Sequence, residues 1–131
     1  MGHTYVIVKV YDLSLSSCRE VKLMVDTGST YTWVSKELLS KLRIKPDRKR
    51  DFRTIEGKII KRLAGMGIVE CMNERAPTIF VFAEEGDAEV LGVHALEGLG
   101  LEVDPTTKEL RKVKAVLAMQ AALRYRKKTC R

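Results

Sequence analysis

The chain has 131 residues, of which 45% are hydrophobic and 31% charged, and its formal net charge is +7. This length predicts one domain with a sizeable core, and this composition is typical of a soluble globular protein. The best apolar run, residues 115–119, is far too short to span a bilayer, so we expect no membrane association.

The three cysteines, Cys18, Cys71 and Cys130, include no C-x-x-C pair. An odd number without metal-ligand spacing indicates a reducing compartment and argues against a disulfide framework or a zinc site. The N-terminal residues also lack the basic stretch and long apolar core of a secretory signal. We therefore expect a cytoplasmic protein without a metal. The single Asn73 and Gln120, amid many charged residues, are typical of a thermophile.

The charged side chains are distributed in blocks. Residues 41–62 carry ten basic and three acidic side chains, residues 63–104 one and nine, and residues 105–131 nine and one. Such blocks can attract nucleic acids or acidic substrates, but no aromatic or glycine-rich nucleic-acid motif accompanies them. We therefore interpret them as solvated or complementary faces, and a nucleic-acid partner is not favoured.

The N-terminal third predicts three strands and a short helix. Residues 4–11 and 21–25 alternate apolar and polar side chains, as strands do, and residues 32–34 form a third extended piece. Ser35 is placed to cap a helix over residues 36–42, in which leucines share one face.

The rest of the chain predicts further short strands. Residues 45–53 are interpreted as a polar loop, and TIEGKII after it predicts a hairpin with Glu56 and Gly57 in its turn. Residues 64–67 are a competing glycine-rich tip. The remaining predicted elements are strands over residues 68–71, 78–83 and 90–91, a helix over 94–99, a turn near 104–105, and a helix or strand within 109–126. The sum is a mainly β fold, a barrel or a sandwich, with one or two short helices.

A run of small polar residues stands where a strand enters the core. Asp26, Thr27, Gly28 and Ser29 follow the apolar strand over residues 21–25 directly. A carboxylate in this position is costly to leave half-buried without a function. The alternatives are an ordinary turn and a phosphate-binding hairpin like that of actin-like ATPases. The ATPase architecture needs two lobes and a much longer chain, and no dinucleotide or P-loop motif is present, so no nucleotide cofactor is expected.

The order of these features resembles the small single-domain retropepsin-like aspartyl proteases, the retroviral-type form also found in archaea and bacteria. An apolar strand leads into Asp-Thr-Gly-Ser, and an extended segment ending at residues 33–34 follows. The hairpin over residues 55–60 stands where the flap of this family lies. Val90, Leu91 and Gly92 match the hydrophobic-hydrophobic-glycine motif that precedes its helix.

The resemblance defines a protease domain over residues 1–114 and leaves residues 115–131 as a basic, partly helical C-terminal extension. It implies a closed β-barrel that is active as a homodimer. Peptide hydrolysis by carboxylates requires two of them, and this chain has one Asp-Thr-Gly, so Asp26 of each protomer must face the other. The implied partners are a second copy of the chain and a peptide or protein substrate, without a cofactor.

The resemblance also implies roles for the neighbouring residues. Asp26 is catalytic, Thr27 locks the two active-site loops together, and Gly28 lets the substrate backbone approach closely. Ser29, Glu56 and Gly57 contact substrate. We further expect the Ser29 hydroxyl to donate to the Asp26 carboxylate, so that Ser29→Ala raises the pH optimum. The basic residues 48–53 would bias selection toward acidic substrate residues.

The sequence departs from the pattern of the family at two positions, and two other interpretations of its function remain open. Many viral members have an Arg and an acidic residue that support the dimer, where this chain has Val93 and Thr30. A thiol protease built on Cys71 and His94 has no local signature. The main alternative function is a non-catalytic dimerising or nucleic-acid-binding module on the same fold, which uses the basic loop and tail.

Overall fold

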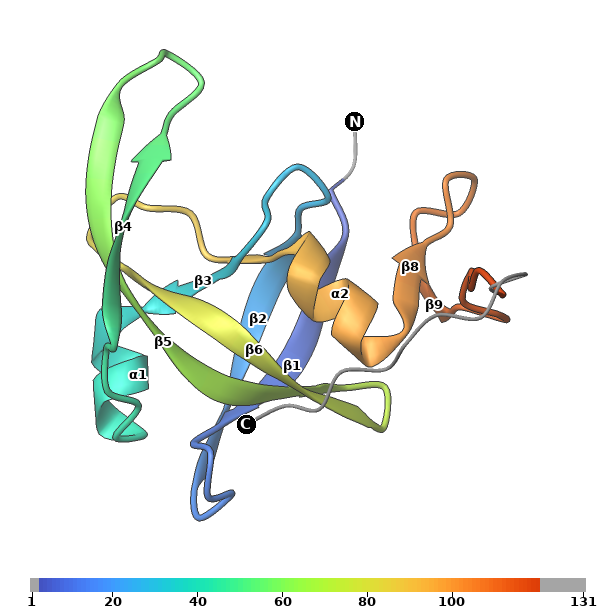
Figure 1. Cartoon of the computed structure of the whole chain (residues 1–131), viewed down its shortest axis with the longest axis horizontal. Helices are drawn as coiled ribbons and strands as arrows, with labels where there is room; N and C mark the ends of the chain where they lie inside the picture. Colours follow the sequence, from blue (N-terminus) through green and yellow to red (C-terminus); the bar gives the residue numbers. More distant parts are fainter. Residues whose placement is uncertain (1–2, 121–131) are drawn as a thin grey trace, which may run out of the picture.

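The computed structural model describes residues 3–120. Nine strands and two short helices follow one another along this part of the chain (Figure 1). Seven strands form one sheet, and the last two form a separate pair. The elements are β1 (Tyr5–Tyr11), β2 (Cys18–Val25), β3 (Thr32–Ser35), α1 (Lys36–Lys41), β4 (Arg48–Arg53), β5 (Ile59–Cys71), β6 (Glu74–Ala83), β7 (Val90–Leu91), α2 (Val93–Leu99), β8 (Leu101–Val103) and β9 (Leu110–Lys112).

The larger sheet has the strand order β1-β2-β7-β3-β6-β5-β4. β1 pairs with β2 along its whole length and also with the far part of β5, so the sheet returns on itself. Most neighbours are antiparallel, but β2 with β7 and β3 with β6 are parallel. The short strand β7 therefore lies between the end of β2 and the start of β3, the two strands that flank the Asp26 loop.

The apolar core lies inside the curved sheet and beneath the two helices. Alternate positions of the strands and one face of each helix supply its side chains, as their periodicities require. The helix α2 packs mainly against β6 and closes one side of this core (Figure 1). The most buried residues of the apolar core include Val8, Val10, Leu23, Val34, Leu39, Val69, Phe80 and Leu91.

The mainly β fold and most of the predicted elements are confirmed, with small shifts in their bounds. The strands β1, β2, β3 and β7 and the helix α2 lie where the sequence predicted them. Ser35 caps α1 as predicted, because its hydroxyl accepts a hydrogen bond from the Leu38 backbone N–H at 3.2 Å. β6 begins at Glu74, four residues before its predicted start.

Two predictions in the middle of the chain are wrong. The segment interpreted as a polar loop contains the strand β4, which pairs with β5 at the edge of the sheet and leaves most of its polar side chains exposed. β5 also runs without interruption through Gly65 and Gly67. A Cβ atom on Gly65 would lie 2.4 Å from the Lys45 carbonyl oxygen, so this glycine lets a neighbouring segment cross closely.

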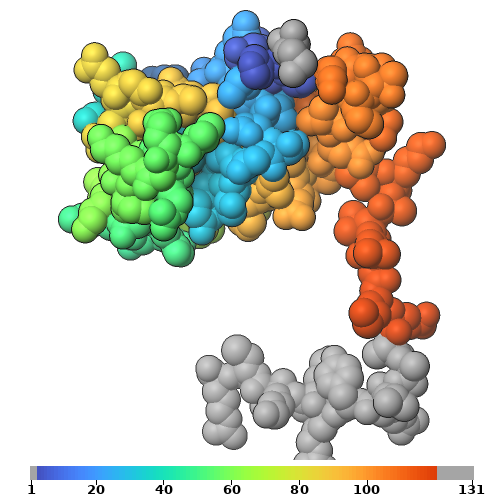
Figure 2. Space-filling model, turned by 90° about the horizontal axis from the view of Figure 1, so that it is seen from above, coloured from blue at the N-terminus to red at the C-terminus, as the bar shows by residue number. Residues whose placement is uncertain are grey.

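The ambiguous C-terminal segment contains the strand β9 rather than a long helix. Residues 113–120 form no helix and leave the body of the domain (Figure 2), with Val116, Leu117 and Met119 exposed. Residues 115–120 of the predicted extension thus contain no helix, and its remainder, 121–131, lies outside the described residues, so the partly helical extension stays a prediction. Within residues 3–120, neither helix has the length and apolar character needed to cross a bilayer.

Candidate active site

Asp26 lies at the end of β2, on a tight turn held by backbone hydrogen bonds. Its N–H donates to the Leu91 carbonyl at 3.0 Å, and its own carbonyl accepts from the Ser29 N–H at 3.1 Å. The Gly28 N–H donates to the carboxylate oxygen Oδ1 at 2.9 Å. The side chain is half-buried. The turn therefore holds the carboxylate in one orientation while leaving it accessible to solvent.

The start of α2 supports this turn from the inside. The Val93 N–H donates to the Ser29 carbonyl at 2.8 Å, and the His94 N–H donates to the Thr30 carbonyl at 3.0 Å. Gly92 permits this approach, because a Cβ atom there would lie 2.3 Å from the Tyr31 carbonyl oxygen. The hydrophobic-hydrophobic-glycine motif is thus a contact surface for the loop that carries the carboxylate.

Thr32 is a supporting residue that the sequence analysis missed. Its side chain is fully buried, and its hydroxyl accepts a hydrogen bond from the Gly92 N–H at 3.1 Å. The sequence did offer one sign of this role: Thr32 places a hydroxyl at an inward position of the predicted third strand, where an apolar side chain is expected. The bond ties the strand after the Asp26 turn to the residue before α2.

Replacing Thr32 by Val should lower the free energy of unfolding by about 1–3 kcal/mol, because the Gly92 N–H then has no acceptor in a buried position. Thr32→Ser keeps the hydroxyl and serves as the matched control, with a smaller loss. Urea unfolding of the three proteins measures the difference. Equal stability of Thr32→Val and the wild type would show that this hydrogen bond contributes nothing.

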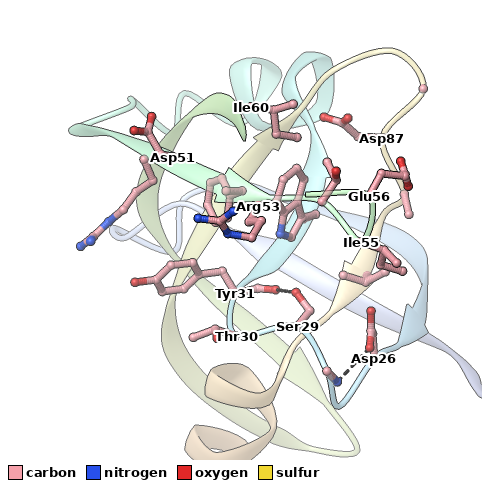
Figure 3. Close-up of a pocket in the computed structure, with 18 residues that line it drawn as sticks. Asp26, Ser29, Thr30, Tyr31, Asp51, Arg53, Ile55, Glu56, Ile60 and Asp87 are labelled. Carbon is pink, nitrogen blue, oxygen red and sulfur yellow. Dashed lines mark hydrogen bonds between the residues drawn. The ribbon is translucent and has the colours of Figure 1, made fainter. Parts of the chain in front are cut away.

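A groove of about 840 Å³ lies over the carboxylate. Three segments line it: the turn from Asp26 to Trp33, the β4–β5 hairpin, and the loop that leads into β7 (Figure 3). Glu56 is part of the hairpin wall, and Gly28 and Ser29 form part of the floor. Four of the six predicted site residues therefore line one groove. Gly57 lies in the turn of the hairpin but not in the lining, and Thr27 is exposed next to Asp26.

Aromatic side chains join the hairpin to the Asp26 turn. The Phe52 ring of β4 meets the Trp33 ring edge-on at 4.8 Å between centroids and the Tyr31 ring at 6.2 Å. Edge-to-face pairs at these distances are attractive beyond the area that they bury. The Arg50 guanidinium lies over Tyr31 at 5.9 Å, at the outer end of the groove. The hairpin and the turn thus lie side by side on one face (Figure 2).

The hairpin turns at Gly57, as predicted. This glycine has φ of +89°, which residues with a side chain rarely adopt, and its N–H donates to the Thr54 carbonyl at 2.9 Å. Ile55, next to the turn, is fully exposed. The competing tip at residues 64–67 is wrong, because both of its glycines lie in the buried middle of β5.

The Ser29 hydroxyl does not contact the Asp26 carboxylate. The Ser29 hydroxyl donates to the Tyr31 carbonyl at 2.8 Å. The Asp26 carboxylate instead accepts a hydrogen bond from the backbone N–H of Gly28. The prediction failed because the Ser29 hydroxyl points toward the Tyr31 carbonyl, two residues later in the same loop, and not toward Asp26. The expected rise in pH optimum for Ser29→Ala therefore loses its basis.

The Ser29→Ala variant should instead keep the wild-type pH–rate profile and lose about 0.5–1.5 kcal/mol of stability with the hydroxyl bond. Thermal unfolding and a pH series of cleavage rates measure the two effects separately. A shifted pH profile at wild-type stability would mean that the Ser29 hydroxyl reaches the Asp26 carboxylate in solution.

An ion pair connects the hairpin to the third wall of the groove. Asp87 accepts from Arg62 Nε at 2.6 Å and from Arg62 Nη2 at 2.9 Å. The Arg62 hydrogen bonds hold the pKa of Asp87 below its ordinary value, against the partial burial that would raise it. Because the folded-state pKa is lowered, the pair stabilises the fold above the ordinary carboxyl pKa. This contribution is lost as the pH falls through the lowered pKa.

Cys71 and His94, the pair of the alternative thiol-protease interpretation, do not form a second site. Burial raises the pKa of the Cys71 thiol, which disfavours a nucleophilic thiolate. His94 Nδ1 lies 3.4 Å from the Thr78 hydroxyl, and no hydrogen bond in the described part of the chain joins it to Cys71. Within residues 3–120 no cluster of three or more His, Cys, Asp or Glu side chains has the arrangement of a metal site.

A mainly β fold with a carboxylate on an Asp-Thr-Gly turn beneath a hairpin is the arrangement that the sequence resemblance to aspartyl proteases leads us to expect. Residues 16–98 match the sequence profile of the family described as "gag-polyprotein putative aspartyl protease". The chain belongs to this family of retropepsin-like aspartyl proteases. No match was found among curated protein sequences.

The fold is also similar to a solved structure. The crystal structure of a retropepsin-like aspartic protease from Rickettsia conorii matches with a TM-score of 0.52 and 23% sequence identity. The match covers 79% of this chain and 77% of that chain. The common fold therefore extends over most of both chains.

Proposed function

We propose that the protein is an aspartyl endopeptidase that is active as a homodimer. The observation that carries this proposal is the Asp26 turn, which presents one oriented carboxylate in an open groove. The family supports the chemistry. Asp87, another carboxylate on the groove, is bound to Arg62 and cannot serve as the second acid. Because the chain has a single Asp-Thr-Gly turn, we infer that the second catalytic carboxylate is Asp26 of a second copy.

The reaction needs one ionised and one protonated carboxylate. The ionised Asp26 takes a proton from water while the oxygen of that water attacks the peptide carbonyl carbon. The protonated Asp26 of the other protomer donates its proton to the carbonyl oxygen. Collapse of the tetrahedral intermediate breaks the C–N bond, and the amine leaves with a proton from the pair. Two carboxylates in contact do not both ionise readily, so the pair can share one proton, which supplies both roles.

The substrate lies extended in the groove, between the Asp26 turns and the hairpin. An extended peptide can form backbone hydrogen bonds with the strand edges around Gly57, as in other strand-addition complexes. Gly28 leaves the floor of the groove flat, since a Cβ atom there would meet only the Asp26 carboxylate, at 3.2 Å. The exposed Thr27 is available to the loop of the partner. The β1–β5 pairing supports a closed barrel as the rigid base of this site.

Two measurements test the proposal together. Sedimentation equilibrium over a range of concentrations should show a dimer, and a peptide library should be cleaved by the wild type but not by Asp26→Asn. A strict monomer at every concentration would leave one catalytic aspartate per particle and overturn the proposal. Steeply salt-dependent binding of DNA or RNA without any cleavage would favour the non-catalytic alternative.

A further inference from the structure

Arg62 and Asp87 form the most enclosed ion pair in the described part of the chain. Their side chains are 15% and 13% exposed, whereas the Arg75–Glu70 pair farther along β5 has values of 52% and 19%. The guanidinium binds the carboxylate through two nitrogens, at 2.6 and 2.9 Å. Bidentate, poorly solvated pairs of this kind hold a defined geometry, which a flexible surface pair does not.

The pair also uses its remaining polar atoms. Asp87 Oδ2 accepts from the Glu84 backbone N–H at 2.8 Å, and Arg62 Nη1 donates to the Lys61 carbonyl at 2.8 Å. The carboxylate therefore orders its own loop, from Glu84 to Glu89, at the same time as it holds β5. Removing either partner would leave a charged group without compensation in a largely enclosed position.

The loop that carries Asp87 leads directly to the catalytic turn. Glu89, at its end, accepts a hydrogen bond from the Ser35 N–H at 2.9 Å through its carboxylate. The strand β7 begins at the next residue, and its Leu91 carbonyl accepts the N–H of Asp26 at 3.0 Å. A continuous bonded path thus runs from Arg62 on the hairpin to the backbone of the catalytic aspartate.

We propose that the Arg62–Asp87 pair is a positioning device, which sets the hairpin over the groove and couples it to the loop that supports Asp26. The inference rests on the proposed function for its effect on catalysis. Beyond Arg62, the tip of the hairpin is exposed from Ile55 to Ile59, and the Phe52 ring of β4 contacts Trp33 of the body. The ion pair therefore attaches the hairpin to the body in addition to the Phe52 contacts and the Arg50–Tyr31 contact.

Hydrogen exchange of the full-length protein tests the coupling without any substrate. In Arg62→Gln, the amides of residues 49–61 should exchange about 10-fold faster, since a charge-assisted attachment is lost. The amides of β6 should be unchanged. Arg75→Gln removes the arginine of the more exposed Arg75–Glu70 pair and should leave the hairpin amides at their wild-type rates. Equal hairpin rates in Arg62→Gln and the wild type, or the same increase in Arg75→Gln, would overturn the proposal.

Cleavage kinetics distinguish positioning from simple stability. For Asp87→Asn and Arg62→Gln, KM should rise about 10-fold with a smaller change in kcat, at a temperature where unfolding shows both variants folded. The exchanged double variant Arg62→Asp/Asp87→Arg should recover part of this loss. A uniform fall in kcat at unchanged KM, without recovery in the double variant, would count against a positioning role. A wild type that cleaves no peptide refutes the proposed function, while the exchange result still decides the attachment.

Discussion

Mixing the wild type with the Asp26→Asn variant should lower the proteolytic rate as the square of the wild-type fraction. If each active site takes one Asp26 from each protomer, only wild-type pairs carry two carboxylates. An equal mixture should then retain about a quarter of the activity, since random pairing gives a quarter of wild-type dimers. The homogeneous variant should lose activity by about 10²- to 10⁴-fold, because an amide cannot accept the proton of water.

The measurement follows initial cleavage rates against mixing ratio, at a total concentration where subunits exchange. Asp51→Asn is a suitable control, because Asp51 lines the same groove from the hairpin but is not part of the catalytic pair. Mixtures of that variant with the wild type should show no squared dependence. A linear fall in the Asp26→Asn mixtures would mean that each chain works alone and would contradict the shared site.

Gly92→Ala should be the most damaging single substitution outside the catalytic residue. The new Cβ atom would lie 2.3 Å from the Tyr31 carbonyl oxygen and 2.8 Å from that of Ser29. The loop cannot retreat easily, because the Ser29 carbonyl is bound by the Val93 N–H. Overpacking against fixed backbone costs about 3 kcal/mol at the upper end of its usual range. The displaced loop also carries Asp26, so the folded fraction should lose activity.

Gly98→Ala is the matched control for this substitution. Gly98 lies in α2, only six residues away, and a Cβ atom there would contact just the Ala76 side chain, at 3.1 Å. Alanine also favours the helix by about 1 kcal/mol over glycine, which offsets this close contact. Urea unfolding should therefore show a large loss for Gly92→Ala and a change below about 1 kcal/mol for Gly98→Ala. Similar losses at both positions would show that the contact with the loop is not the cause.

Local sequence signals were sufficient wherever a strand or turn depends on its own residues. The alternation in β1 and β2 and the hydroxyl of Ser35 before α1 predicted elements that the structure confirms. The Glu56-Gly57 turn was predicted correctly for the same reason, since a positive φ favours glycine in that position. The Asp-Thr-Gly motif was also sufficient to suggest the family.

Local sequence signals failed where the pairing of distant strands overrides the conformational preference of the residues themselves. β4 is rich in arginine and has no apolar alternation, yet it forms a strand because β5 offers a complete row of backbone partners. The glycines of β5 were interpreted as a loop tip, although the strand continues through both and Gly65 admits the close crossing of Lys45. The Ser29 hydroxyl was assigned to the wrong acceptor, because the direction of a side chain within a turn depends on the folded loop.

Residue identities and spacings were enough to indicate the Asp-Thr-Gly motif, the expectation of a second carboxylate from another copy, and the turn of the hairpin. Each of these depends on residues that are neighbours in the chain. The support of the Asp26 turn by Thr32 and Gly92, and the meeting of Arg62 with Asp87, became visible only in the folded chain. These partners are between 25 and 60 positions apart. Their contacts depend on how the sheet curves and which strands pair, and no local pattern of residue types encodes that.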